Sequence, residues 1–175
     1  MTDTVPCLML SLQDKTLLVP SEAVAEIIPF EEPKSIEESP DWLLGVLSWR
    51  GINIPLGYLE KMESYLTWSR GEIKHIEDKH KFFIAVINRI YKIDTQDQKT
   101  NQYPFFSIVL KNIPKLFRIT KDGIKVVNKA KEGDPRYLME IKIQNDRAFI
   151  PDLNALWKMI DSLPPRLQWF RQIVL

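Results

Sequence analysis

Short apolar runs, each ended by polar or glycine-containing residues, recur along the chain and set the tightest limit on its fold. Runs of this length that are rich in β-branched and aromatic residues are typical of β-strands. They occupy Cys7–Gln13, Thr16–Val19, residues 24–28, the stretch from Gly45 to Leu59, Lys81–Ile90, Phe105–Leu110, Leu116–Thr120, Ile124–Val127, Tyr137–Ile143 and Ala148–Ile150. The chain is therefore predicted to form roughly nine or ten short strands.

One convincing helix is predicted, near the C-terminal end, over Leu153–Ile160. Apolar residues recur there at helical spacing, Asp152 is a suitable N-cap, and Pro164-Pro165 would end the segment. Single helical turns are also expected over Ser21–Glu26 and Asp41–Leu44, because serine and aspartate are favourable N-caps.

Many short strands with a single helix favour small β-barrels over a fold of alternating strands and helices. The 175 residues are enough for one domain, or for two small subdomains that share a core. We therefore expect a mainly β chain that forms a single domain over residues 1–175. Polar connections are expected to be inserted at about residues 60–81 and 92–103.

Composition excludes several classes of function. The chain is 45% hydrophobic and 27% charged, with a formal net charge of +1, so it has no strong attraction to nucleic acid or to an anionic membrane. The single cysteine, Cys7, excludes an intrachain disulfide and indicates a reducing compartment. The chain shows neither a basic leader nor an apolar run of about 20 residues. We expect a cytoplasmic protein without membrane insertion.

The chain carries none of the short motifs that would indicate catalysis, neither a phosphate-binding glycine loop nor a GxSxG or HExxH sequence. His75 and His80 are five residues apart, a spacing that does not place both rings on one helix face, so a solvated charged face is favoured over a metal site. Cys7 lies in an apolar run, which favours an inert buried thiol. We expect no catalytic residue, metal or cofactor.

The segment GVLSWRGINIPLGYL, from Gly45, places a charged residue and a glycine inside an otherwise buried pattern. If the strand continues through Arg50, that side chain shares a face with Val46 and Ser48. An unpaired buried guanidinium is very costly, so Arg50 should reach the surface or pair with a carboxylate. Gly51 would permit a bulge or bend, and Pro55 suits an edge strand or a strand end.

Several of these segments together carry a resemblance to a known family. LSLQDKTLLVPSEAVAEII contains a hairpin and then a V-x-E-I element, Pro40 follows, and the segment from Gly45 to Pro55 matches G-V-x-x-x-R-G-x-x-x-P, with Leu59 closing the region. In these residues the chain resembles the CheW-like family, the adaptor domains of bacterial chemosensory arrays. KFFIAVI, FFSIVLKNIPKLFRIT and NDRAFIPDLNALWKMI are similar to segments of that family's second half.

The resemblance implies two intertwined five-stranded β-barrels with a hydrophobic seam between them, a C-terminal helix and no catalysis. It also implies two partners, the cytoplasmic tip of a chemoreceptor and the regulatory domain of a CheA-like histidine kinase. The enlarged connections suggest a divergent adaptor, like the accessory CheW-like proteins of the type IV pilus (twitching) system.

The resemblance also suggests which residues bind a partner. It places Val24, Glu26, Gly45, Arg50 and Gly51 at or beside the receptor-contact groove and puts Glu26 near Arg50. Each position has a plainer interpretation. The Arg50–Glu26 pair would only hold two strands together, Val24 would be a core residue, and Gly45 would be a turn glycine.

Two other functions fit the sequence less well. The aromatic content would suit a β-barrel that binds single-stranded nucleic acid, but the near-zero charge argues against it, and the phenylalanines lie in apolar runs typical of a core. No motif supports a small enzyme. The C-terminal segment LQWFRQIVL would expose apolar residues unless it docks, which makes self-association a further hypothesis.

Overall fold

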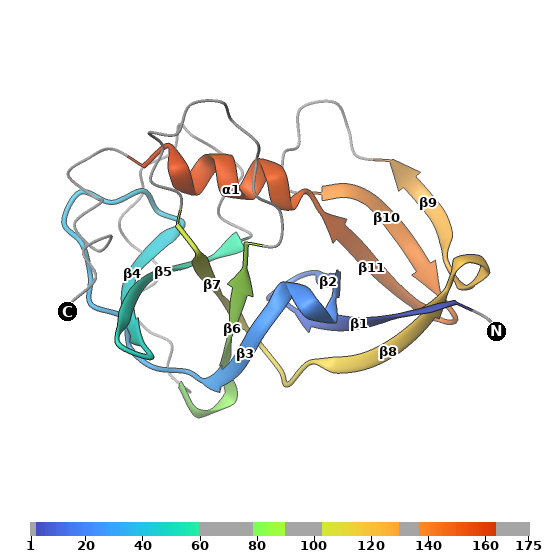
Figure 1. Cartoon of the computed structure of the whole chain (residues 1–175), viewed down its shortest axis with the longest axis horizontal. Coiled ribbons are helices and arrows are strands. Elements are labelled where there is room, and N and C mark those ends of the chain that lie inside the picture. Colours follow the sequence, from blue (N-terminus) through green and yellow to red (C-terminus); the bar gives the residue numbers. More distant parts are fainter. Residues whose placement is uncertain (1–2, 60–78, 90–102, 130–136, 164–175) are drawn as a thin grey trace.

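The computed structural model describes residues 3–59, 79–89, 103–129 and 137–163, which form two β-sheets and one α-helix (Figure 1). The six-stranded sheet has the order β8-β1-β2-β11-β10-β9, and the five-stranded sheet has the order β3-β6-β7-β5-β4. The strands of the first are β1 (Thr4–Ser11), β2 (Thr16–Pro20), β8 (Lys115–Thr120), β9 (Lys125–Lys129), β10 (Tyr137–Ile143) and β11 (Asp146–Pro151). Those of the second are β3 (Val24–Pro29), β4 (Leu43–Trp49), β5 (Ile52–Gly57), β6 (Phe83–Asn88) and β7 (Phe105–Leu110).

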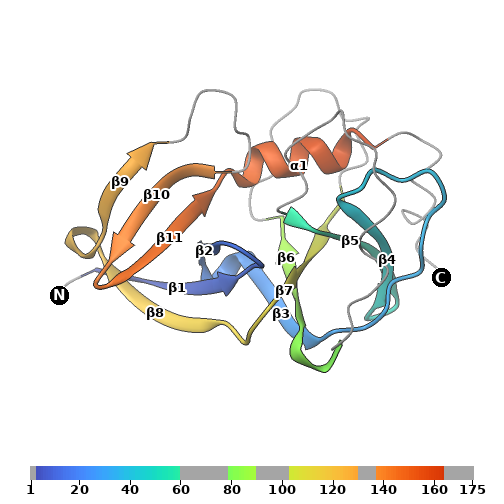
Figure 2. The same ribbon diagram turned by 180° about the vertical axis from the view of Figure 1, so that it is seen from behind.

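The two sheets are intertwined, because the chain starts in the first sheet, builds the whole second sheet, and then returns. Neighbouring strands pair antiparallel except at two places, where β11 runs parallel to β2 and β5 runs parallel to β7. Figure 2, from behind, shows the sheets side by side with α1 (Leu153–Asp161) lying across both. No helix in the described residues is long and apolar enough to cross a membrane.

Successive side chains of the inner strands point to opposite faces of their sheet, and this divides the buried hydrophobic residues into three clusters. In β1, Met9 faces a cluster inside the first sheet, whereas Leu10 faces the seam between the sheets. In β6, Ile84 faces a cluster inside the second sheet, and Ala85 faces the seam. Each sheet therefore curves around a hydrophobic cluster of its own, and the opposite faces of the two sheets pack together over the third cluster, in the seam. Strands buried on both faces read as continuous apolar runs, which is the sequence pattern observed.

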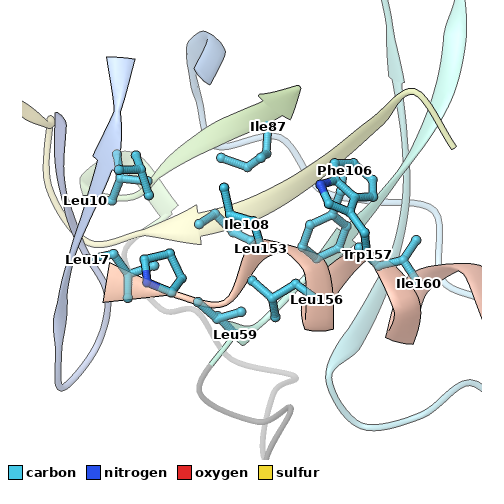
Figure 3. A pocket seen from close by; sticks show the side chains of 12 residues that line it. Leu10, Leu17, Leu59, Ile87, Phe106, Ile108, Leu153, Leu156, Trp157 and Ile160 are labelled. Carbon is cyan, nitrogen blue, oxygen red and sulfur yellow. The ribbon is translucent and has the colours of Figure 1, made fainter. Parts of the chain in front are cut away.

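The helix α1 packs its apolar face into the seam, with Leu156, Trp157 and Ile160 buried. The Asp152 carboxylate accepts a hydrogen bond from the Ala155 amide at 3.0 Å, which confirms the predicted N-cap. A small apolar cavity of about 20 Å³ remains beneath the helix (Figure 3). The described residues that line it come from both sheets and α1, and none of them is ionisable.

The mainly β, two-sheet architecture with a C-terminal helix is confirmed. Three details differ from the prediction. The first sheet has six strands instead of five, and no ladder joins its outer strands β8 and β9 in the described residues. Both expected helical turns are shorter than predicted. Over Ser21–Glu26, one 3-10 turn spans only Ser21–Ala23 and no side chain caps it, because β3 begins at Val24. Asp41 and Trp42 form a turn in which the Leu43 amide donates to the Pro40 carbonyl at 2.9 Å, and the buried Leu43 already begins β4.

The third difference concerns Pro55, which lies in an interior strand and not at a sheet edge. The parallel ladder between β5 and β7 begins only at Leu56, one residue further on. The Pro55 carbonyl accepts a hydrogen bond of 2.7 Å from the fully buried Ser107 hydroxyl. A proline is therefore tolerated in this strand next to the start of the ladder, and the buried serine has a partner.

Candidate partner-binding corner

A two-residue turn joins β4 to β5 and carries the arginine that the sequence singled out. Trp49 pairs with Ile52, so only Arg50 and Gly51 remain in the turn. Both have positive φ, 49° and 78°, as required at the two central positions of a type I′ hairpin turn. The expectation that Arg50 continues the strand and shares a face with Val46 is therefore wrong. Gly51 supplies the positive φ of the turn, so it is a turn residue and not a bulge.

Glu26 in β3 receives two donors from this hairpin. The Trp49 indole nitrogen donates a hydrogen bond of 2.8 Å to Glu26 Oε2, and Arg50 Nη2 lies 3.1 Å from the same oxygen. The Arg50 guanidinium also lies 4.9 Å from the centre of the Trp49 ring. The predicted pairing of Arg50 with Glu26 is confirmed, and we call Glu26, Trp49, Arg50 and Gly51 the Arg50 corner.

The Arg50 corner connects the two outer strands of the five-stranded sheet, because β3 and β4 lie at opposite ends of its strand order. An isolated bridge pairs Lys34, in the connection that follows β3, with Val46 of β4, through backbone hydrogen bonds of 2.9 Å in both directions. The two outer strands of the second sheet are therefore joined by the side chains of the corner, and the connection between them lies against β4. A bulge in β3, where Val24 and Glu26 face consecutive residues of β6, sets the position of Glu26.

Exposure distinguishes the members of the corner. The Arg50 side chain is 67% exposed and that of Glu26 is 36% exposed, whereas Trp49 is buried. An exposed ion pair contributes only about 0–1 kcal/mol to stability, because water screens it. The pair therefore does little to hold the strands together. It presents a guanidinium to solvent in a geometry fixed by a carboxylate and an indole.

Gly45 is a strand residue, so the turn-glycine interpretation is wrong. It follows a bulge in β4 and has φ of 149°. A side chain at Gly45 would overlap the Lys34 carbonyl oxygen, the group that bonds to the Val46 amide. Glycine is required here because the chain leading into β4 packs directly against this strand.

Val24 begins β3, pairs with Ile87, and packs half-buried against the seam core. Of the five predicted residues, the structure thus brings Glu26, Arg50 and Gly51 together in the corner. Val24 contacts the seam core and Gly45 contacts the Lys34 backbone, so these two residues support the two outer strands, β3 and β4, from which the corner is built.

Two contributors were missed by sequence reasoning. Sequence reasoning gave Trp49 no role, although its indole fixes Glu26. Arg89 was not singled out at all, yet it forms a two-contact pair with Asp161, with distances of 3.0 and 2.7 Å. The only sequence signal for Arg89 was a charged residue directly after a strongly apolar strand.

Groups that would indicate catalysis do not assemble in the described residues. Cys7 is buried, and burial raises the pKa of its thiol, so the thiolate is disfavoured at neutral pH. No cluster of three or more possible metal ligands occurs in the described ranges. His75 of HIEDKH lies outside those ranges.

Comparisons with known proteins bear on the same fold. A family model described as CheW-like domain matches residues 6–160 of the chain. Among solved structures, the chain is similar to the crystal structure of scaffolding protein TtCheW from Thermoanaerobacter tengcongensis. The TM-score is 0.60 with 15% identity, over 85% of this chain and 89% of that one. No curated protein sequence matches the chain. At this identity the structural likeness shows the fold, and the family match spans most of the chain.

Proposed function

Because the chain belongs to the CheW-like domain family, we propose that it couples the cytoplasmic tip of a chemoreceptor to a CheA-like histidine kinase. The family consists of scaffold and adaptor proteins of chemotaxis signalling, not of enzymes. The proposal adds a specific pair of partners, a cytoplasmic location, and a single adaptor domain over residues 1–175. It involves neither nucleic acid nor membrane insertion.

The observation that carries the proposal is the preorganised guanidinium of the Arg50 corner. Arg50 lies at a hairpin tip, is 67% exposed, and has its position fixed from one side by Glu26 and Trp49. Arginine donates several hydrogen bonds in a rigid fork, so it suits recognition of a carboxylate or carbonyl on a partner. A side chain that is already oriented loses less conformational entropy on binding.

The proposed mechanism is differential binding. A receptor that changes its conformation changes its contacts with the Arg50 corner, and the adaptor transmits that change to the kinase bound elsewhere on its surface. Each contact is expected to be modest in area, and repetition of the contacts in an array raises the overall avidity. Val24 supports β3, which carries Glu26, and Gly45 supports β4, which leads into the turn that carries Arg50.

We assign the protein, within this proposal, to the divergent adaptors of a twitching motility system that uses type IV pili. The basis is the length of the connections at about residues 60–81 and 92–103. Most of these residues lie outside the described ranges, as does the C-terminal segment invoked for self-association.

Affinity capture tests the proposal. Wild-type protein and the Arg50→Glu variant are immobilised and exposed to a bacterial lysate, and bound proteins are identified by mass spectrometry. Arg147→Glu is the matched control, because Arg147 is also 67% exposed and also lies 3.1 Å from a glutamate, Glu140, on the other sheet.

We expect wild type and the Arg147→Glu control to recover a chemoreceptor and a CheA-like kinase, and Arg50→Glu to lose the receptor. Equal receptor recovery by Arg50→Glu would contradict the assigned corner. Recovery of nucleic acid in place of both proteins would contradict the adaptor function itself.

A further inference from the structure

The outer strands of the two sheets differ in whether described contacts connect them to each other. In the five-stranded sheet, the Glu26–Trp49 hydrogen bond connects the outer strands β3 and β4, and the Lys34–Val46 bridge pairs β4 with the segment that follows β3. In the six-stranded sheet, β8 and β9 end the strand order, and no ladder between them occurs in the described residues. Within the described residues, no strand pairs with the outer edge of β9, and Figure 1 shows β9 at the end of the molecule away from β4.

Exposed apolar side chains gather on the same sheet. The large hydrophobic residues that are exposed in the described ranges all belong to β1, β8, β9, β10 or the connection into β8. They are Val5, Ile113, Leu116, Val126, Val127 and Leu138. The strand β9 is exposed along its whole length, with Val126 and Val127 at 54% and 39%. Val126, Val127 and Leu138 lie on the adjacent strands β9 and β10, so the outer edge of the sheet carries exposed apolar surface of the kind found at interaction sites.

The segment from residue 111 to residue 129, which contains β8 and β9, is strongly positive although the whole chain is nearly neutral. Residues 111–129 contain six basic side chains and a single acidic one, Asp122. The basic ones are Lys111, Lys115, Arg118, Lys121, Lys125 and Lys129. All six are exposed. Lys125 and Lys129 are the first and last residues of β9, and Val126, Val127 and Asn128 lie between them.

We propose that β9 binds an extended acidic segment of a partner protein, which adds to the six-stranded sheet as a further strand. The free amides and carbonyls of an edge strand provide the main-chain hydrogen bonds for such strand addition. Apolar side chains on one face of the segment contact Val126, and carboxylates on its other face approach Lys125, because Val126 and Lys125 pair with the consecutive residues Ile141 and Lys142 of β10. This surface is separate from the Arg50 corner and does not depend on the function proposed for that corner.

The β9–β10 ladder supplies a specific reason for an acidic partner. Lys125 lies directly opposite Lys142, and like charges in opposite positions destabilise a sheet. No ion pair joins either lysine to a carboxylate in the described part of the chain. A carboxylate brought by the partner would lie near both cations and relieve this repulsion.

The residue types favour a protein over a nucleic acid. Bases of single-stranded nucleic acid stack on exposed aromatic rings. The large exposed hydrophobic residues among those described are all aliphatic. Lysines at a sheet edge also hinder pairing between identical copies, which favours a partner of opposite charge over a second copy of the chain.

The test uses a fluorescently labelled peptide that alternates glutamate with valine, with fluorescence anisotropy as the readout. The first protein variant carries Lys125→Glu and Lys129→Glu together. The control variant is Lys158→Glu, which reverses an exposed lysine on α1. The peptide control has the same sequence with every backbone amide N-methylated. It keeps its charge but has no N–H group to donate, so it cannot pair as a strand.

We expect the peptide to bind wild type and Lys158→Glu alike, and to bind the double variant at least about tenfold more weakly, a change of about 1.4 kcal/mol. The N-methylated peptide should also lose at least about tenfold in affinity, a result that needs no protein variant. Equal binding of both peptides would overturn strand addition. If the double variant bound the peptide as tightly as wild type does, the site would be overturned. Displacement of the peptide from wild type by a single-stranded oligonucleotide of the same charge would also overturn it. A dimer in light scattering that only the double variant abolishes would assign the edge to a second copy instead.

Discussion

Two arginine–carboxylate pairs in this protein share their chemistry and differ in their surroundings. Arg89 is 6% exposed, binds both oxygens of Asp161, donates a 2.7 Å hydrogen bond to the Tyr103 carbonyl, and lies 4.2 Å from the centre of the Trp157 ring. Arg50 is 67% exposed and contacts one oxygen of Glu26. The first pair fastens α1 to the five-stranded sheet. The second orients a charge that remains accessible.

The difference separates stability from recognition. Removing one partner of a buried pair leaves an uncompensated charge and costs about 3–5 kcal/mol, whereas an exposed pair contributes about 0–1 kcal/mol. The arginine that matters for folding is therefore Arg89. Arg50 can change without unfolding the protein, which leaves it available for a partner.

The largest expected effect is on Arg89. Asp161→Ala should lower the free energy of unfolding by about 3 kcal/mol, measured by urea denaturation, because Arg89 keeps its charge in a nearly dry position. Replacing both residues, as Arg89→Met with Asp161→Leu, should cost clearly less, because no buried charge remains. A loss below about 1 kcal/mol in Asp161→Ala would place this pair in the same class as the exposed one.

The next effect concerns the backbone behind the Arg50 corner. Gly45→Ala should destabilise the fold by about 2 kcal/mol in the same assay, because its methyl group would overlap the Lys34 carbonyl. Gly51→Ala is the matched control, since it has positive φ but open space around it, and it should cost about 1 kcal/mol. Equal stability of Gly45→Ala and wild type would mean that the 33–34 segment does not pack on β4.

A smaller effect is expected for the indole that fixes Glu26. Trp49→Phe keeps an aromatic ring and removes the donor of the 2.8 Å hydrogen bond, so it should cost about 1 kcal/mol of stability. Receptor binding should weaken as well, because Glu26 then orients Arg50 less firmly. Wild-type receptor affinity in this variant would show that Arg50 acts without that support.

The sequence was sufficient for most of the strands and for α1. Apolar runs buried on both faces marked β1, β6 and β7, and the Asp152 cap marked the helix start. The pattern failed where tertiary contacts override local preference. Asp41 resembles a helix cap, yet Trp42 and Leu43 are buried at the start of β4. Arg50-Gly51 is not a common hairpin dipeptide, so the turn was not recognised.

The candidate site could be predicted only in part, because it depends on how the second sheet closes. The Arg50–Glu26 pairing followed from a family resemblance and is confirmed. The role of Trp49 did not follow, because β3 and β4 are distant in the strand order and meet only through curvature. Arg89 and Asp161 are 72 residues apart, and no local pattern connects them.

The central claim is that Arg50 acts on a partner and not on the fold, and a charge-swapped pair tests it most directly. A chemoreceptor tip fragment is titrated calorimetrically into wild type, Arg50→Glu, and the swapped variant with Glu26→Arg and Arg50→Glu, and urea unfolding of each is measured. We predict unfolding free energies within about 1 kcal/mol of wild type for Arg50→Glu, and at least about tenfold weaker receptor binding for both variants. Restored binding in the swapped variant, or unfolding of Arg50→Glu, would show instead that the pair serves only to hold β3 against the hairpin.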